Sequence, residues 1–216
     1  ISFKDVWFAY NEENWVLKGL SLDVKSGESL ALVGATGAGK TSVINLLSRF
    51  YEYSKGSIAL DGQDIRNINT SDLRNHVGVV LQDVFLFSDT VHNNITINNK
   101  EISREQVIEA AKDVGAHEFI MKLPNDYDYN VRERGAMLSA GQRQLISFIR
   151  AYVYNPAILI LDEATSSIDT ESEEIIQHAI SKLTENRTSI IIAHRLATIQ
   201  KATNILVMDA GKVVEH

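Results

Sequence analysis

The segment Gly34-Ala35-Thr36-Gly37-Ala38-Gly39-Lys40-Thr41 decides the fold of this chain, because it fits the pattern G-x-x-x-x-G-K-S/T. It follows the apolar run Leu30–Val33 and precedes an amphipathic segment, so a strand, a tight loop and a helix are predicted in succession. Glycines let consecutive backbone N–H groups point into one concavity, and the start of the helix adds partial positive charge. The loop is therefore expected to bind phosphate groups.

The residues of this loop have separable roles. Lys40 brings a full positive charge to the β- and γ-phosphates of a nucleotide, and the hydroxyl of Thr41 is a ligand for Mg²⁺. A glycine-rich turn with a surface lysine is the plain alternative, which the predicted strand and helix on either side disfavour. The expected ATP-binding residues are the loop and the residue after it, namely Gly34, Ala35, Thr36, Gly37, Ala38, Gly39, Lys40, Thr41 and Ser42.

Two acids follow another apolar run, Ile158–Leu161. A strand buried on both faces carries charge only at its carboxyl end, which is where ligands bind in open α/β sheets. Asp162 is expected to hold Mg²⁺, directly or through water, and Glu163 to orient or deprotonate an attacking water. Alone, this pair could simply begin the next element, but together with the phosphate loop it predicts nucleotide hydrolysis.

Short apolar runs separated by helical patterns indicate a buried, mainly parallel sheet. The N-terminal part instead alternates apolar and polar residues at Leu20–Val24, which is typical of half-buried strands. The region from about 83 to 154 is mainly helix and loop. The predicted fold class is α/β, a P-loop NTPase core with an N-terminal antiparallel β subdomain and an inserted α-helical subdomain, all within one domain over 1–216. The apolar core runs are Leu30–Val33, Val77–Leu81, Ile158–Leu161, Ile190–Ala193 and Ile205–Met208.

The helix after the phosphate loop carries an apolar stripe that extends from Val43 to Phe50.

Other helix starts are marked by capping boxes, in which a serine or threonine precedes a glutamine or glutamate by three positions. The predicted capping boxes are Ser103 with Gln106, Ser139 with Gln142, and Thr170 with Glu173.

Composition excludes several classes of protein. With 28 acidic and 21 basic residues the formal charge is −7, so a general nucleic-acid binder is disfavoured. The absence of cysteine excludes disulfides and thiolate metal sites. No apolar run approaches the roughly 18–20 residues that a membrane helix needs. The first residue is Ile1 rather than Met, so the chain is expected to be part of a longer protein.

The segment Leu138-Ser139-Ala140-Gly141-Gln142 resembles the signature motif of the ABC (ATP-binding cassette) family, commonly LSGGQ. Taken alone, it is explained by its capping box. In the family this motif binds the ATP held by a partner domain in a head-to-tail dimer, which the resemblance implies for Ser139, Ala140, Gly141 and Gln142. Ala140 stands where the family usually has glycine and adds a Cβ near the partner's γ-phosphate, a change we expect to be tolerated.

Four further positions match motifs of the family in the right order. Tyr10 resembles the aromatic residue that stacks on adenine, and Gln82 the Q-loop glutamine that senses Mg²⁺. Asp169 matches the D-loop at the dimer interface, and His194 the switch histidine at the γ-phosphate. The resemblance thus implies catalytic roles for Glu163, His194, Lys40 and Gln82, and a metal site formed by Thr41, Gln82 and Asp162.

Two segments point to the exporter branch of the family. Phe85–Val91 with Asn94-Ile95 is similar to the exporter segment after the Q-loop, and Arg132–Gly135 to the exporter X-loop. The resemblance implies an ATPase that uses ATP and Mg²⁺ at the cytoplasmic face of a membrane, namely a bacterial inner or plasma membrane. Its partners would be a transmembrane domain fused upstream of Ile1 and a second nucleotide-binding domain, in a homodimer or a heterodimer.

Two other functions compete with transport-coupled hydrolysis. One is an ATP-binding clamp with little turnover, which the retention of Glu163 and His194 disfavours. The other is a DNA-maintenance ATPase, which would carry a long coiled coil between the phosphate loop and the signature segment. The gap is only 98 residues (138 − 40) and has no sustained heptads. The transported substrate is not indicated by this sequence.

Overall fold

The computed structural model describes residues 1–11, 14–162, 170–193 and 195–215, without the side chains of residues 170–172. The chain divides into two compact units. The first comprises Ile1–Val79, Ala157–Ala164 and Asn186–His216, and the second comprises Val80–Pro156 and Thr165–Glu185. The helical region expected over about 83–154 thus lies inside the second unit, which also takes in a later helix.

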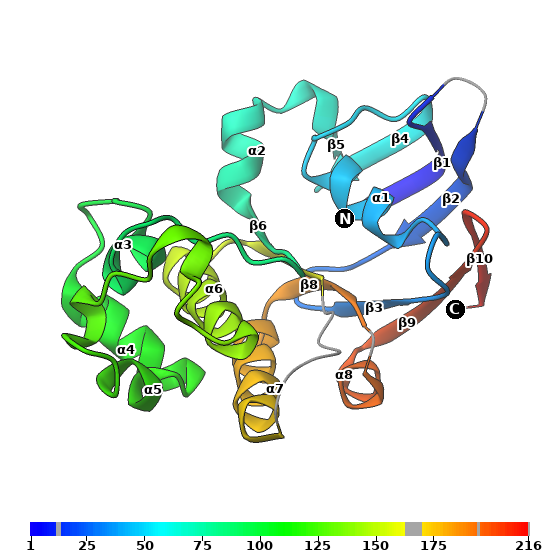
Figure 1. Cartoon of the computed structure of the whole chain (residues 1–216). Coiled ribbons are helices and arrows are strands. Elements are labelled where there is room, and N and C mark those ends of the chain that lie inside the picture. Colours follow the sequence, from blue (N-terminus) through cyan, green and yellow to red (C-terminus); the bar gives the residue numbers. More distant parts are fainter. Residues whose placement is uncertain (12–13, 163–169, 194, 216) are drawn as a thin grey trace. The chain divides into compact units, whose positions relative to one another are not determined.

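An antiparallel sheet forms the N-terminal part of the first unit, as predicted (Figure 1). Strand β1 (Ser2–Ala9) pairs with β2 (Trp15–Asp23) from Ser2 opposite Asp23 to Ala9 opposite Trp15, and the register shifts at three places along this pairing. The sheet has the order β2-β1-β4-β5, and its other strands are β4 (Lys55–Leu60) and β5 (Gln63–Asp64).

The second sheet has the order β10-β9-β3-β8-β7-β6 and is mainly parallel. Strand β3 (Ser29–Val33) lies between β8 (Thr188–Ile192) and β9 (Asn204–Asp209) and is parallel to both. Strand β7 (Ile158–Asp162) is parallel to β8, whereas β10 (Lys212–Glu215) is antiparallel to β9; β6 (Val77–Val80) is at the other edge. Strands β3 and β7 run in the same direction, because both are parallel to β8. The loop at Gly34 and the residue Asp162 therefore lie at the same side of the sheet, where the carboxyl ends of these strands are.

Helix α1 (Lys40–Leu47) lies between the two sheets (Figure 1). Its apolar side chains, from Val43 to Leu47, join residues of both sheets in one buried cluster. The predicted stripe is wrong at its end, because α1 stops at Leu47 and Phe50 is exposed. The other described helices of this unit are η1 (Ile65–Asn67), α2 (Thr70–His76) and α8 (Leu196–Lys201).

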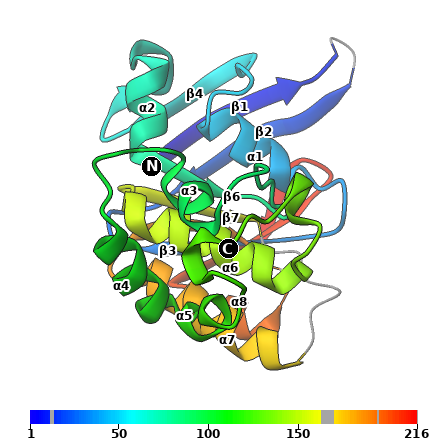
Figure 2. The same cartoon turned by 60° about the vertical axis from the view of Figure 1, so that its left-hand side comes forward.

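The second unit is helical, and its longest described helices are α6 (Ala140–Tyr154) and α7 (Thr170–Thr184), which pack on each other. Helix α6 also contacts α3 (Val91–Thr96) and α4 (Arg104–Val114) (Figure 2). The capping boxes of α4 and α6 are confirmed, whereas Thr170 belongs to the residues whose side chains are not described. Within the described ranges, every helix is too short or too polar to cross a membrane. The shorter helices are α5 (His117–Met121), η2 (Asp126–Asp128) and η3 (Glu133–Gly135).

Candidate functional site

The predicted phosphate loop connects the end of β3 to the start of α1, as the sequence indicates. Its tip, Ala35–Gly37, is exposed, whereas Ala38, Gly39 and Lys40 are buried at its base. The N–H groups in the first turn of a helix have no acceptor within that helix, and they carry the positive end of the helix dipole. An exposed loop of small residues on such a helix start is suited to bind an anion.

Two glycines of the loop are required by close packing. A Cβ at Gly34 would collide with the backbone carbonyl of Met208 in β9. Gly39 caps α1 with a φ of 103°, a backbone conformation that residues with a side chain rarely adopt. A Cβ at this position would come within 2.7 Å of Leu17. The loop therefore keeps its curvature only with glycine at these positions.

Lys40 is held inside the loop that it follows. Its Nζ donates hydrogen bonds to the carbonyl oxygens of Gly34, at 2.6 Å, and Ala35, at 3.0 Å. Burial lowers the pKa of Lys40, while the charge of the Asp162 carboxylate acts in the opposite direction. The structure therefore brings together, within the first unit, a buried cation and the acid that is predicted to bind the metal.

The donors available beside Lys40 suit a magnesium ion. Thr41 is exposed at the start of α1. Asp162 is the last residue of β7, at the carboxyl ends of the strands where the loop also lies. Hydroxyl and carboxylate oxygens are the hard ligands that Mg²⁺ prefers, usually together with water and substrate phosphates. These two residues fit the predicted metal site. Gln82, the third predicted ligand, is exposed after β6 in the second unit.

Tyr10 follows β1 and lies against the helix that begins at the loop. Its hydroxyl is 3.1 Å from Oγ of Ser42 and accepts a 3.0 Å hydrogen bond from Nδ2 of Asn45. Ser42 is buried on α1, two residues after Lys40. The residue expected to contact adenine is thus tied directly to the residues expected to bind phosphate.

The contact of Tyr10 with Asn45 was not predicted from sequence. Asn45 lies three positions after Ser42 and thus on the same side of α1, so helical spacing offered a signal for it. Tyr51, which packs on the ring of Tyr10 at a centroid distance of 4.9 Å, offered none.

The signature-like segment forms the start of α6 in the second unit. Ser139 is the N-cap residue: its Oγ accepts a hydrogen bond from the N–H of Gln142, and the Gln142 side chain accepts one from the N–H of Ser139. Ser139 and Ala140 are exposed, whereas Gly141 is buried. An exposed hydroxyl at the start of a 15-residue helix is a second place suited to an anion.

The exporter-like segment in the same unit presents two exposed aromatic rings. Phe85 and Phe87 meet edge to face at 5.1 Å. Asn94 is fully buried, and its side chain both donates to the carbonyl and accepts from the N–H of Phe87, at 3.0 and 2.8 Å. Asn94 therefore fixes the backbone that displays this aromatic pair.

Three predicted site residues, Glu163, Asp169 and His194, lie outside the described residues. Their assignments stay predictions, as do the roles of Gln82 and of the signature segment toward a nucleotide. Within the described ranges, the predicted residues that the structure brings together are Tyr10, the loop from Gly34 to Ser42, and Asp162.

Comparison with known proteins assigns residues 17–166 to the family described as ABC transporter. The whole chain is 48% identical to a Bacillus subtilis protein named "Probable multidrug resistance ABC transporter ATP-binding/permease protein", of which it covers 32%. It is 47% identical to the "ATP-dependent lipid A-core flippase" of Francisella novicida, of which it covers 36%. The chain therefore spans about a third of the length of these relatives.

Among solved structures, a bacterial Atm1-family ABC exporter with ATP bound superposes with a TM-score of 0.91 at 42% sequence identity. The match covers 99% of this chain and 37% of that protein. The predicted P-loop core, with its antiparallel β part and its helical part, is thereby confirmed as a fold shared with a known exporter.

Proposed function

Because this chain belongs to the ABC transporter family, we propose that it binds and hydrolyses ATP to drive export by a larger membrane protein. The observation that carries the proposal is the position of Lys40, which is buried in the loop with its Nζ 2.6 Å from the Gly34 carbonyl and within the field of Asp162. A cation and an acid at the carboxyl edge of a parallel sheet are suited to a metal–nucleotide complex.

The proposed reaction is in-line attack of water on the γ-phosphate of ATP. The loop amides and Lys40 bind the phosphates and stabilise the charge that develops on them, while Tyr10 contacts the adenine. A bound Mg²⁺, held by Thr41 and Asp162 and sensed by Gln82, would neutralise phosphate charge. Glu163 orients or deprotonates the water, and His194 contacts the γ-phosphate.

A second nucleotide-binding domain completes the site in this proposal. The exposed start of α6, Ser139–Gln142, would contact the ATP held by the partner, whose own copy of this segment would contact the ATP held here. Asp169 would lie at the interface between the two domains. The partner is either a second copy or a related chain.

The rest of the transporter would span a membrane, with this domain at its cytoplasmic face. Support comes from the relative named as an ATP-binding/permease protein, of which this chain covers 32%. The exposed pair Phe85 and Phe87 would face the transmembrane partner. The transported substrate would be selected in that other part of the protein.

The decisive experiment replaces the proposed base in the full-length protein. Glu163→Gln should still bind ATP but lose turnover by about 10²-fold or more, because the attacking water is no longer activated. Size-exclusion chromatography with ATP should show a trapped dimer. Glu174→Gln, on the exposed side of α7, is the matched control and should hydrolyse ATP normally.

Normal hydrolysis by Glu163→Gln would remove this residue from the role of base. An ATP-binding clamp is the competing function, which the presence of Glu163 and His194 disfavours. Tight ATP binding by the unsubstituted full-length protein without measurable turnover would establish the clamp instead.

A further inference from the structure

The ring of Tyr10 is held at both ends within the first unit. At one end, its hydroxyl meets Ser42 and Asn45 of α1 at 3.1 and 3.0 Å. At the other, the ring meets Phe8 at 4.7 Å and Tyr51 at 4.9 Å, with interplanar angles of 78° and 89°. Tyr10 nevertheless remains 45% exposed, so the ring is fixed and still accessible to a ligand.

Tyr51 is not placed by burial, because it is itself 48% exposed. The described ring contacts of Tyr51 are with Tyr10 and with Phe8, the latter at 5.8 Å. A half-exposed tyrosine gains little from removal of apolar surface from water, so another part of the structure must hold it in place.

The turn that carries Tyr51 is a well-defined helix end. After α1, the N–H of Phe50 donates to the carbonyl of Asn45 at 2.9 Å and the N–H of Arg49 to that of Leu46 at 3.0 Å. This pair of hydrogen bonds, with Arg49 in the left-handed conformation at a φ of 50°, is a Schellman turn. Glycine is the usual residue at this position, so the contacts of the Arg49 side chain have to offset the strain of its positive φ.

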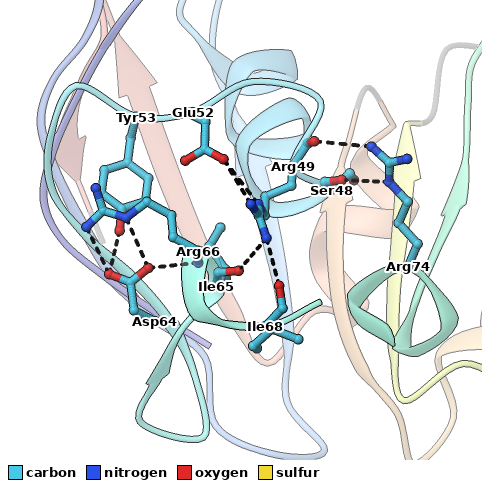
Figure 3. Close-up of polar contacts among 9 residues, drawn as sticks. All are labelled: Ser48, Arg49, Glu52, Tyr53, Asp64, Ile65, Arg66, Ile68 and Arg74. Carbon is cyan, nitrogen blue, oxygen red and sulfur yellow. Dashed lines mark hydrogen bonds and ion pairs between the residues drawn. The ribbon is translucent and has the colours of Figure 1, made fainter. Parts of the chain in front are cut away.

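Two arginines hold this turn (Figure 3). Arg49 donates through Nη1 to the carbonyls of Ile65 and Ile68, at 3.1 and 2.7 Å, and contacts Glu52. From α2, Arg74 donates to the carbonyls of Ser48 and Arg49, at 3.3 and 3.2 Å. Cations at the carboxyl end of a helix are favoured by its dipole, so both guanidinium groups stabilise the turn that precedes Tyr51.

We propose that Tyr51 is a positioning residue for nucleotide binding, which holds the Tyr10 ring in the orientation that stacks on adenine, while Arg49 and Arg74 hold the turn that precedes Tyr51. The inference rests on the proposed ATP-binding function. A ring that is already ordered loses no further freedom when the base binds, and this preorganisation strengthens binding. Because Tyr51 acts on the adenine end alone, the phosphate end should not be affected by its loss.

The test compares two probes, Mg–ATP and Mg–tripolyphosphate, by calorimetric titration of the full-length protein. Tyr51→Ala should weaken ATP binding by about threefold to tenfold, the range expected when one side chain has to be ordered on binding, and leave tripolyphosphate binding unchanged. Tyr51→Phe keeps the ring and should restore the affinity for ATP. Tyr154→Ala, which removes a similarly half-exposed tyrosine at the end of α6, is the control and should change neither affinity.

Unchanged ATP affinity in Tyr51→Ala would overturn the inference, and so would an equal loss for both probes, because that would indicate a general effect on the fold. If Tyr51→Ala does not fold, Tyr51→Leu keeps apolar contact with Phe8 without an aromatic edge, and it should show the same selective loss. Lys40→Met should weaken both probes. If the unsubstituted protein bound neither probe, the proposal that this chain binds ATP would be wrong, and the inference about Tyr51 would be wrong as well.

Discussion

The Nζ atom of Lys40 donates a 2.6 Å hydrogen bond to the carbonyl oxygen of Gly34, so the cation of the phosphate loop is held by the loop itself. Burial lowers the pKa of Lys40, which means that the folded protein disfavours the charged form. A cation that is held away from water in this way is expected to serve a ligand rather than the stability of the fold.

Lys40→Met should therefore leave the stability of the nucleotide-free protein within about 1 kcal/mol, because the loss of two hydrogen bonds is offset by removal of a buried charge. The rise in melting temperature on addition of Mg–ATP should disappear. Thermal unfolding with and without nucleotide measures both effects. Lys55→Met, at an exposed lysine, should keep the nucleotide-induced rise; a marked destabilisation of Lys40→Met without nucleotide would mean that Lys40 is structural.

The capping boxes of α4 and α6 provide a matched pair of variants. Ser103→Ala and Ser139→Ala each remove an N-cap hydroxyl that accepts a hydrogen bond from a glutamine N–H three positions later. Each should cost about 1 kcal/mol of unfolding free energy. ATP turnover of the full-length protein should fall only in Ser139→Ala, because only this serine is proposed to contact nucleotide. An equal fall in both variants would mean that the activity is lost through stability.

Because of Asp64, the stability of the first unit is expected to decrease at acid pH. Burial acts to raise the pKa of Asp64, but hydrogen bonds from Arg66 and Tyr53 outweigh it and lower the pKa from 3.8 to about 2. The carboxylate therefore contributes stability that is complete above about pH 4 and is lost as the pH falls through about 2. The shift corresponds to about 2 kcal/mol.

Asp64→Asn should accordingly lower the unfolding free energy by about 2 kcal/mol at pH 7 and by progressively less below pH 4. Denaturant unfolding at a series of pH values measures this difference. Tyr53→Phe removes the hydroxyl that donates to Asp64 at 2.6 Å, so it should move the acid-dependent loss to higher pH. A difference between wild type and Asp64→Asn that did not change with pH would contradict the assignment.

Arg49 allows backbone strain to be separated from side-chain contacts. Arg49→Ala should destabilise the protein, because it loses the hydrogen bonds to Ile65 and Ile68 and keeps a non-glycine residue in the left-handed region. Arg49→Gly loses the same bonds but relieves the strain, so it should be more stable than Arg49→Ala by about 0.5–1 kcal/mol. Chemical denaturation measures the order. The reverse order would mean that the turn does not depend on this conformation.

Local patterns in the sequence were enough to predict much of the fold and of the candidate site. The phosphate loop was predictable because its glycines, Lys40 and the flanking strand and helix lie within about a dozen residues of one another. The capping boxes at Ser103 and Ser139 were predictable for the same reason, since each depends on residues three positions apart. The roles of Gln82, Glu163, Asp169 and His194 still depend on the family resemblance.

Tertiary contacts decided the rest. The apolar stripe predicted for the first helix extended to Phe50, but the helix ends at Leu47. Arg49 and Arg74 stabilise a turn there by donating hydrogen bonds to backbone carbonyls, and the spacing of apolar residues in the sequence does not predict such contacts. The tie between Tyr10 and Asn45 joins positions 35 residues apart. The amino-acid sequence by itself thus determined which residues are predicted to bind phosphate, because that chemistry is local. The ring of Tyr10, which we propose contacts adenine, is oriented only when β1, α1 and the turn after α1 pack together.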